Sequence, residues 1–98
     1  MNDIELNQIL YDRIISKSMR PQTRFTYDYV EHIASAFEIV HSLVVQEFSL
    51  IDNDIMWTAT FKFNNKLYTA RSSTPAHAIC LAAFALTEST EWTQVKVW

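Results

Sequence analysis

Histidine and cysteine are the side chains of this sequence best suited to chemistry near neutral pH, and two of them lie three residues apart. His77 and Cys80 have the i, i+3 spacing that places both on one side of a helix, where they could share a metal ion or act as nucleophile and base. Two ligands do not complete a metal site, and His32 and His41 belong to another predicted helix. Apolar surroundings raise the pKa of a thiol and make it a poor nucleophile. We therefore interpret Cys80 as a core residue and His77 as a surface residue, and predict no catalytic residue, no metal and no other cofactor.

A group of small polar side chains lies immediately before the same helix. Thr74 is a favoured N-cap residue, and Pro75 suits the first helical position, where no intrahelical N–H donor is needed. Arg71, Ser72, Ser73 and Thr74 could instead bind an anion through the hydroxyl groups and the backbone N–H groups at the helix start. Simple capping explains the same residues. Binding of a small anionic ligand or nucleotide is therefore the alternative interpretation.

Charge is segregated along the chain. Residues 28–54 contain six acidic residues and no Lys or Arg, whereas residues 55–87 contain three basic residues and no acid. If the fold keeps the first block together, it presents an acidic surface that could steer onto a basic partner, such as a nucleic-acid-binding protein. The predicted partner-binding residues are Glu31, Glu38, Asp52 and Asp54. An ordinary solvated helix face is the alternative.

Composition excludes several classes of function. The chain contains no glycine, where average usage gives about seven. Phosphate-binding loops, dinucleotide fingerprints and nucleophile elbows all need glycine for close approach or positive φ, so these enzyme classes are excluded. The basic residues of the first segment are too few to predict direct nucleic-acid binding; they are Arg13, Lys17, Arg20 and Arg24. One cysteine cannot form an internal disulfide, and no segment has the pattern of a signal peptide or a membrane span. We expect a cytoplasmic protein without membrane association.

The strand pattern is clearest between residues 57 and 72. Apolar residues recur at every second position from Trp57 to Phe63, which is typical of a strand with one buried face. The pair Asn64-Asn65 can form a two-residue type I′ turn, because Asn tolerates positive φ. That turn places Phe61 opposite Tyr68 and leaves the other face mostly polar. Residues 45–51 are predicted as a preceding strand, turned by residues 52–54. The helix from Pro75 to Leu86 is apolar nearly all round, so we expect it to be buried centrally on the sheet.

Two helices are predicted before the strands. The first is capped by Asp3 and ends near Arg20, with a buried stripe of Leu6, Leu10 and Ile14. A second apolar stripe of the same helix consists of Ile4, Tyr11, Ile15 and Met19. We interpret it as packed deeply into the fold; the alternative is a partner or dimer surface. The second helix covers about Glu31 to Val44. Its predicted core stripe is Ile33, Phe37, Val40 and Val44, with Glu31, Ser35, Glu38 and Ser42 on the opposite side.

The segment from Trp57 to Ala83 resembles the phage ABA sandwich domain family. The similar features are the tryptophan-containing strand, the Tyr68-Thr69-Ala70 strand, and the helix that starts at Thr74-Pro75-Ala76. The stretch from Tyr29 to Val40 is similar to the family's preceding helix, so the resemblance covers about residues 29–87. The resemblance implies a small phage or prophage protein with helices on both sides of a sheet. It implies no activity that is general to the family.

We therefore predict a single α+β domain over residues 1–98, α/β/α sandwich-like, with two N-terminal helices, a three-stranded antiparallel meander and one buried helix. Residues 1–20 form the N-terminal helix, 29–87 the family-like core and 88–98 a C-terminal extension. The extension alternates from Trp92 to Trp98 like a strand. It is too apolar to be left in water, so it is expected to add a fourth strand to the meander or to pair with a second subunit as a homodimer.

The leading functional hypothesis is a small non-enzymatic phage or prophage protein that binds and inhibits a bacterial host protein. The expected target is a nuclease of a defence system, so the protein would act like an anti-CRISPR protein. The alternative is a protein that sequesters a small anionic ligand or nucleotide.

Overall fold

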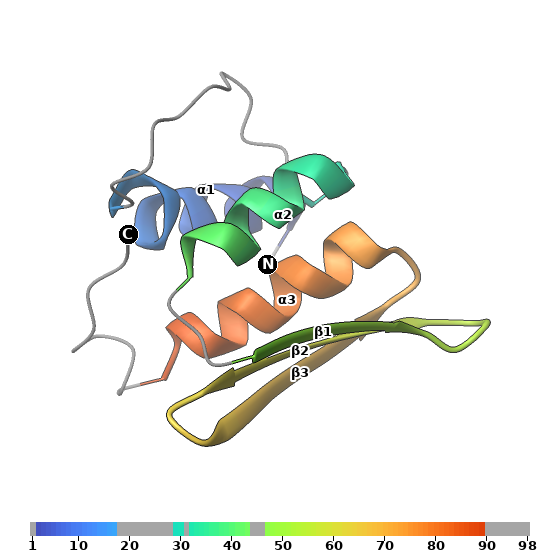
Figure 1. Cartoon of the computed structure of the whole chain (residues 1–98). Helices are drawn as coiled ribbons and strands as arrows, with labels where there is room; N and C mark the ends of the chain where they lie inside the picture. Colours follow the sequence, from blue (N-terminus) through green and yellow to red (C-terminus); the bar gives the residue numbers. More distant parts are fainter. Residues whose placement is uncertain (1, 18–28, 31, 44–46, 90–98) are drawn as a thin grey trace.

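A three-stranded antiparallel sheet with one helix packed on it forms the centre of the fold, as seen in the computed structural model of the chain (Figure 1). The structure describes residues 2–17, 29–30, 32–43 and 47–89. In chain order, the elements are α1 (Asp3–Arg13), a 3₁₀ helix η1 (Ile15–Lys17), α2 (Ile33–Ser42), β1 (Glu47–Asp52), β2 (Trp57–Phe63), β3 (Lys66–Ser72) and α3 (Pro75–Thr87). The α+β class, the order of elements and the three-stranded meander are confirmed. The predicted fourth strand, Trp92 to Trp98, lies outside the described residues.

The sheet has the strand order β1-β2-β3, with both neighbouring pairs antiparallel. Phe61 pairs with Tyr68, as the two-residue turn predicted. The turn residues Asn64 and Asn65 have φ angles of 55° and 64°, the left-handed values that a type I′ turn needs. The alternation of β2 is also confirmed, because Ala59 and Phe61 are fully buried. The turn geometry and the apolar alternation therefore fix the same register.

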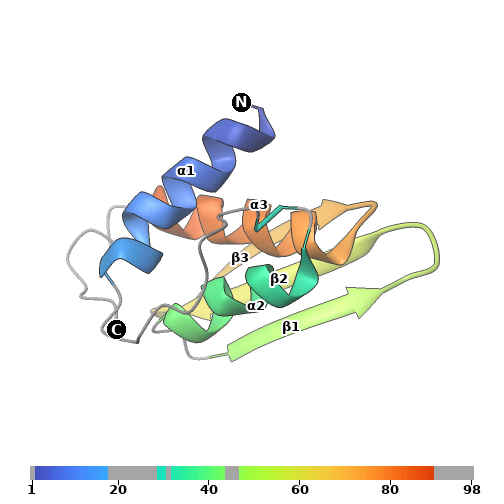
Figure 2. The same cartoon turned by 90° about the horizontal axis from the view of Figure 1, so that it is seen from above.

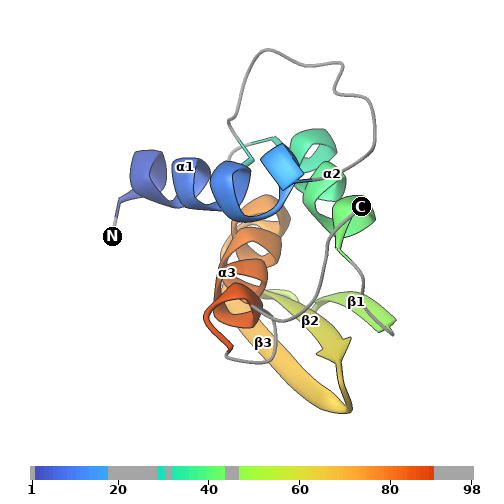
Figure 3. The same cartoon turned by 90° about the vertical axis from the view of Figure 1, so that its left-hand side faces the viewer.

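Helix α3 is the middle layer of the molecule. It contacts β2 and β3 on one side and packs against α1 and α2 on the other (Figures 1 and 3). Eight of its residues are buried, which confirms the predicted central helix. All described helices lie on one side of the sheet, whereas the resemblance implied helices on both sides (Figures 1 and 3). In the view from above, α1 crosses over α3 instead (Figure 2).

Helix α1 differs from its prediction at both ends. Its N-cap is Asn2, whose Oδ1 accepts a hydrogen bond from the N–H of Glu5 at 2.8 Å, rather than Asp3. Its α-helical part ends at Arg13, and the chain continues as a 3₁₀ turn in which the Ser16 hydroxyl donates to the carbonyl of Asp12 at 2.8 Å. The predicted end near Arg20 lies outside the described residues.

The two predicted stripes of α1 have different outcomes. Leu6, Leu10 and Ile14 are buried, which confirms the first stripe. In the second stripe, Ile15 is buried but Ile4 is 80% exposed. Ile4 therefore lies outside the core. Met19 lies outside the described residues.

The buried face of α2 is not the one predicted. Ser35, Ala36, Ile39 and Ser42 are buried, whereas the predicted stripe of Ile33, Phe37 and Val40 is half-buried or exposed. Small side chains let α2 approach the alanine-rich helix α3 closely, and this packing outweighs the larger apolar stripe. The Phe37 ring instead meets Phe48 of β1 edge-on, with centroids 6.1 Å apart. The stripe therefore lies along the flank of the helix beside β1.

Close packing leaves one hydroxyl without a hydrogen bond. Ser35 is fully buried, and its Oγ has no hydrogen-bond partner in the described part of the chain. Ser35→Ala should raise the free energy of unfolding by about 1 kcal/mol, because it removes an unsatisfied buried hydroxyl and adds a better helix former. Chemical denaturation of both proteins measures the change.

Thr87→Val is the matched control. The Thr87 hydroxyl donates to the carbonyl of Phe84 at 2.9 Å and accepts from Arg13 at 3.2 Å, so its removal should lower the free energy of unfolding by about 1 kcal/mol. Destabilisation by both variants would contradict the assignment of Ser35 as an unsatisfied group.

Candidate functional site

The turn between β1 and β2 is held by hydrogen bonds between neighbouring residues. The N–H of Asp54 donates to Oδ1 of Asp52 at 3.0 Å, and the N–H of Met56 donates to Oδ1 of Asn53 at 3.1 Å. The N–H of Asn53 donates in turn to the carbonyl of Met56 at 3.1 Å. Asp54 has φ of 77°, a left-handed value that Asp and Asn tolerate better than most residues. The type of residue at each position therefore fixes the shape of this turn.

The same turn displays both charge and apolar surface. Asp52 and Asp54 are exposed, and Ile51 and Ile55 beside them are 58% and 83% exposed. The turn extends beyond the ends of the helices, at the right of Figure 1. We call residues Ile51 to Ile55 the acidic tip. It is a projection held by hydrogen bonds, with two carboxylates between two isoleucines.

The structure brings together only part of the predicted acidic surface. Asp52 and Asp54 share the acidic tip, whereas Glu38 lies on α2, is half-buried and has an interaction of its own. Glu31 lies outside the described residues. Sequence reasoning grouped all four by their place in the chain and assigned two to a helix and two to a turn, but it could not see how these two elements pack.

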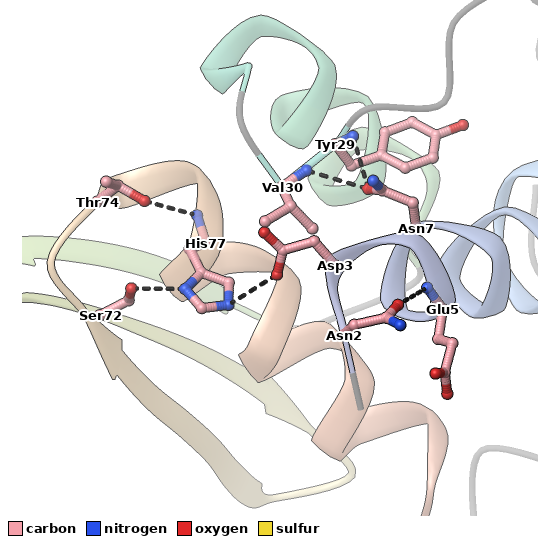
Figure 4. A network of polar contacts seen from close by, with 9 residues as sticks. All are labelled: Asn2, Asp3, Glu5, Asn7, Tyr29, Val30, Ser72, Thr74 and His77. Atoms are coloured by element: carbon pink, nitrogen blue, oxygen red, sulfur yellow. Dashed lines mark hydrogen bonds and ion pairs between the residues drawn. The ribbon is translucent and has the colours of Figure 1, made fainter.

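The start of α3 is capped as predicted. Thr74 is the N-cap, and its Oγ1 accepts a hydrogen bond from the N–H of His77 at 3.3 Å (Figure 4). Ser72 is buried at the end of β3, and its Oγ forms a hydrogen bond of 2.8 Å with Nδ1 of His77. Two of the three hydroxyls predicted for an anion site are thus engaged within the protein. Arg71 and Ser73 are exposed at this helix start.

His77 connects three elements. Besides Ser72 at the end of β3, it faces Asp3 of α1, with Nε2 4.0 Å from the carboxylate Oδ1 (Figure 4). A serine, a histidine and an aspartate are the residue types of a nucleophilic triad, but 4.0 Å is too long for a hydrogen bond and Ser72 is only 6% exposed. The arrangement joins α1 to the start of α3. The side chain of His77 is 35% exposed, so it lies at the surface while one side of it contacts Ser72 and faces Asp3.

The pair of His77 and Cys80 does not form a shared site. Cys80 is fully buried within α3, as predicted, and His77 is turned toward Ser72 and Asp3. Among the described residues, no three His, Cys, Asp or Glu side chains lie close enough to hold a metal ion. Within the same part of the chain, no helix is long and apolar enough to cross a membrane.

Two further anchors hold α1 in place, and sequence reasoning missed both. Asn7 Oδ1 accepts from the N–H groups of Tyr29 at 2.9 Å and Val30 at 3.1 Å (Figure 4). Arg13 forms an ion pair with Glu88 at 3.1 Å and lies over the Phe84 ring, 5.6 Å from its centroid. These contacts join positions 22 to 75 residues apart in the chain, a separation for which local patterns carry no signal.

Comparisons with known proteins support the family and the fold. The sequence profile of the phage ABA sandwich domain matches residues 7–84. A crystal structure of a phage protein from Bacillus cereus ATCC 14579 is similar, with a TM-score of 0.66 and 17% identity, covering 87% of this chain and 91% of that chain. At this identity the similarity shows the fold alone. No curated protein matches.

The assignment of Thr74 as the N-cap of α3 can be tested by substitution. Thr74→Ala should lower the free energy of unfolding by about 0.5 to 2 kcal/mol, because the N–H of His77 loses its acceptor. Thr74→Ser keeps the hydroxyl and should remain within a few tenths of a kcal/mol of the native protein. Urea denaturation of the three proteins measures these differences. Equal stability of the alanine and serine variants would show that the hydroxyl does not cap the helix.

Proposed function

The chain belongs to the phage ABA sandwich domain family, and from that premise we propose that it is a small, non-enzymatic phage or prophage protein that binds and inhibits a protein of the bacterial host. The observation that carries the proposal is the acidic tip. Its two carboxylates and two isoleucines project from the sheet in a turn fixed by hydrogen bonds. Charged and apolar side chains next to each other are suited to binding a partner protein.

Rigidity is what makes the acidic tip suited to binding. A flexible loop loses conformational freedom when it binds, and this loss opposes association. The side-chain oxygens of Asp52 and Asn53 already hold the backbone of the turn. The tip can therefore enter a complex with little further ordering, and the exposed side chain of Ile55 supplies apolar surface for burial.

The charge of the acidic tip indicates the class of partner. Carboxylates steer association with a positively charged surface and suppress association with a negative one. Proteins that act on nucleic acids carry such basic surfaces. We infer that the target is a nucleic-acid-binding host protein, such as a nuclease of a CRISPR or related defence system, met in the cytoplasm of the host cell. Glu38 and Glu31 are secondary members of the predicted surface.

The alternative function is sequestration of a small anionic ligand or nucleotide at the start of α3. It relies on Arg71 and Ser73, because the hydroxyls of Ser72 and Thr74 already have partners. A nucleotide that raises the melting temperature of the native protein, but not that of Arg71→Ala, would support this alternative. If no nucleotide or phosphate changes the melting temperature, the alternative is refuted.

The charge of the acidic tip can be removed without changing its shape. Asp52→Asn with Asp54→Asn keeps an acceptor oxygen at position 52 and a residue tolerant of positive φ at position 54. The double variant should associate with the host target at least about tenfold more slowly at low salt, and the difference should shrink as salt is added. Affinity capture from host lysate with the native protein supplies the target, and surface plasmon resonance measures the rates.

Asp12→Asn is the matched control, because Asp12 is an exposed carboxylate on α1, away from the acidic tip. It should leave the association rate unchanged, and all variants should keep the native melting temperature within a few degrees. An equal reduction by the control and by the tip variant would refute the acidic tip as the binding element. Binding without loss of the target's activity would refute inhibition.

A further inference from the structure

The outer face of the sheet is a regular three-by-three array of side chains. The register places Ile51, Thr58 and Arg71 in one row, Ser49, Thr60 and Thr69 in the next, and Glu47, Lys62 and Leu67 in the third. All described helices lie on the opposite side of the sheet (Figures 1 and 3). None of them covers these nine side chains.

Two properties of the array are unusual for a solvated face. Its opposite corners Ile51 and Leu67 are large apolar residues, 58% and 68% exposed. The other two corners are Glu47 and Arg71, which are exposed and form no ion pair with any described residue. The central threonine, Thr60, forms a hydroxyl pair with Thr69 at 3.1 Å. Apolar residues thus occupy the two ends of one diagonal, and opposite charges the two ends of the other.

This arrangement is complementary to itself. When two copies meet face to face about a two-fold axis along the line from Ile51 to Leu67, each isoleucine meets the other isoleucine and each leucine the other leucine. The same axis brings Glu47 of each copy toward Arg71 of the other. Rows are about 6.6 Å apart and strands about 4.8 Å apart, so the charges are offset by a few ångström that long side chains can span.

The remaining members of the array also match under this axis. Thr58 meets Ser49, and Lys62 meets Thr69, so hydroxyls meet hydroxyls or a cation. No acid faces an acid and no base faces a base. An axis along the strands would instead place Leu67 over Glu47, and an axis across them would place Ile51 over Glu47. Only the axis through Ile51 and Leu67 satisfies both the apolar and the charged corners.

We propose that the outer face of the sheet binds a second copy of this chain, with Glu47 and Arg71 forming two reciprocal ion pairs around an apolar diagonal. The array covers about 300 Å² of sheet plane, well below the roughly 800 Å² per partner of a standard stable interface. The dimer is therefore weak and depends on protein concentration. This inference does not rest on the proposed host partner.

Charge reversal tests the reciprocal pairs. Glu47→Arg places bases at both charged corners, and Arg71→Glu places acids at both, so each variant alone sets like charges opposite each other. Each should dimerise at least about tenfold more weakly than the native protein in sedimentation equilibrium. An equimolar mixture of the two variants restores both ion pairs in a heterodimer. It should dimerise about as well as the native protein.

Glu5→Arg is the matched control. It changes an exposed acid on α1, outside the array, and should leave dimerisation unchanged. Circular dichroism establishes that each variant is folded. A native protein that stays monomeric up to millimolar concentration would overturn the proposal. Dimerisation unaffected by either reversal, or no recovery in the mixture, would also overturn this interface.

Discussion

The close approach of α3 to its neighbours is the constraint on which the rest of this structure depends. Four buried alanines of α3 leave room for the sheet on one side and for α1 and α2 on the other; they are Ala76, Ala78, Ala82 and Ala83. A chain of this size can bury only one core, and in this structure the sheet, α1 and α2 share that core through α3. This explains why small residues of α2, including Ser35, occupy the interface while the larger Phe37 lies at its flank. It also explains why none of the described helices lies on the outer sheet face.

Features that depend on a few adjacent residues could be predicted from the sequence. The Asn64-Asn65 turn fixes the register of β2 and β3, and Thr74 with Pro75 fixes the start of α3, because each depends on the conformations of a few adjacent residues. The buried face of α2 could not be predicted, since hydrophobicity alone favoured Ile33 and Phe37. The outcome depended on how closely α2 could approach α3, and that distance is a property of both helices.

The candidate site could also be predicted only where it depends on residues close together in the sequence. Asp52 and Asp54 were predicted as a turn and as part of an acidic surface, and the structure places them together because they are two residues apart. Glu38 belongs to another element, and only the packing of α2 determines where it lies. The contact of His77 with Asp3, and those of Asn7 and Arg13, join distant parts of the chain. A single sequence contains no local signal for such pairs.

The acidic tip and the outer sheet face meet at Ile51, which belongs to both. In the proposed dimer, the two copies of Ile51 lie on the two-fold axis, so the two acidic tips lie at the same end of the assembly. Their like charges oppose dimerisation at low salt, while the reciprocal pairs of Glu47 and Arg71 favour it. The same geometry concentrates negative potential at one end. A host target with two basic sites would then meet two tips at once, and the second contact would form at high effective concentration.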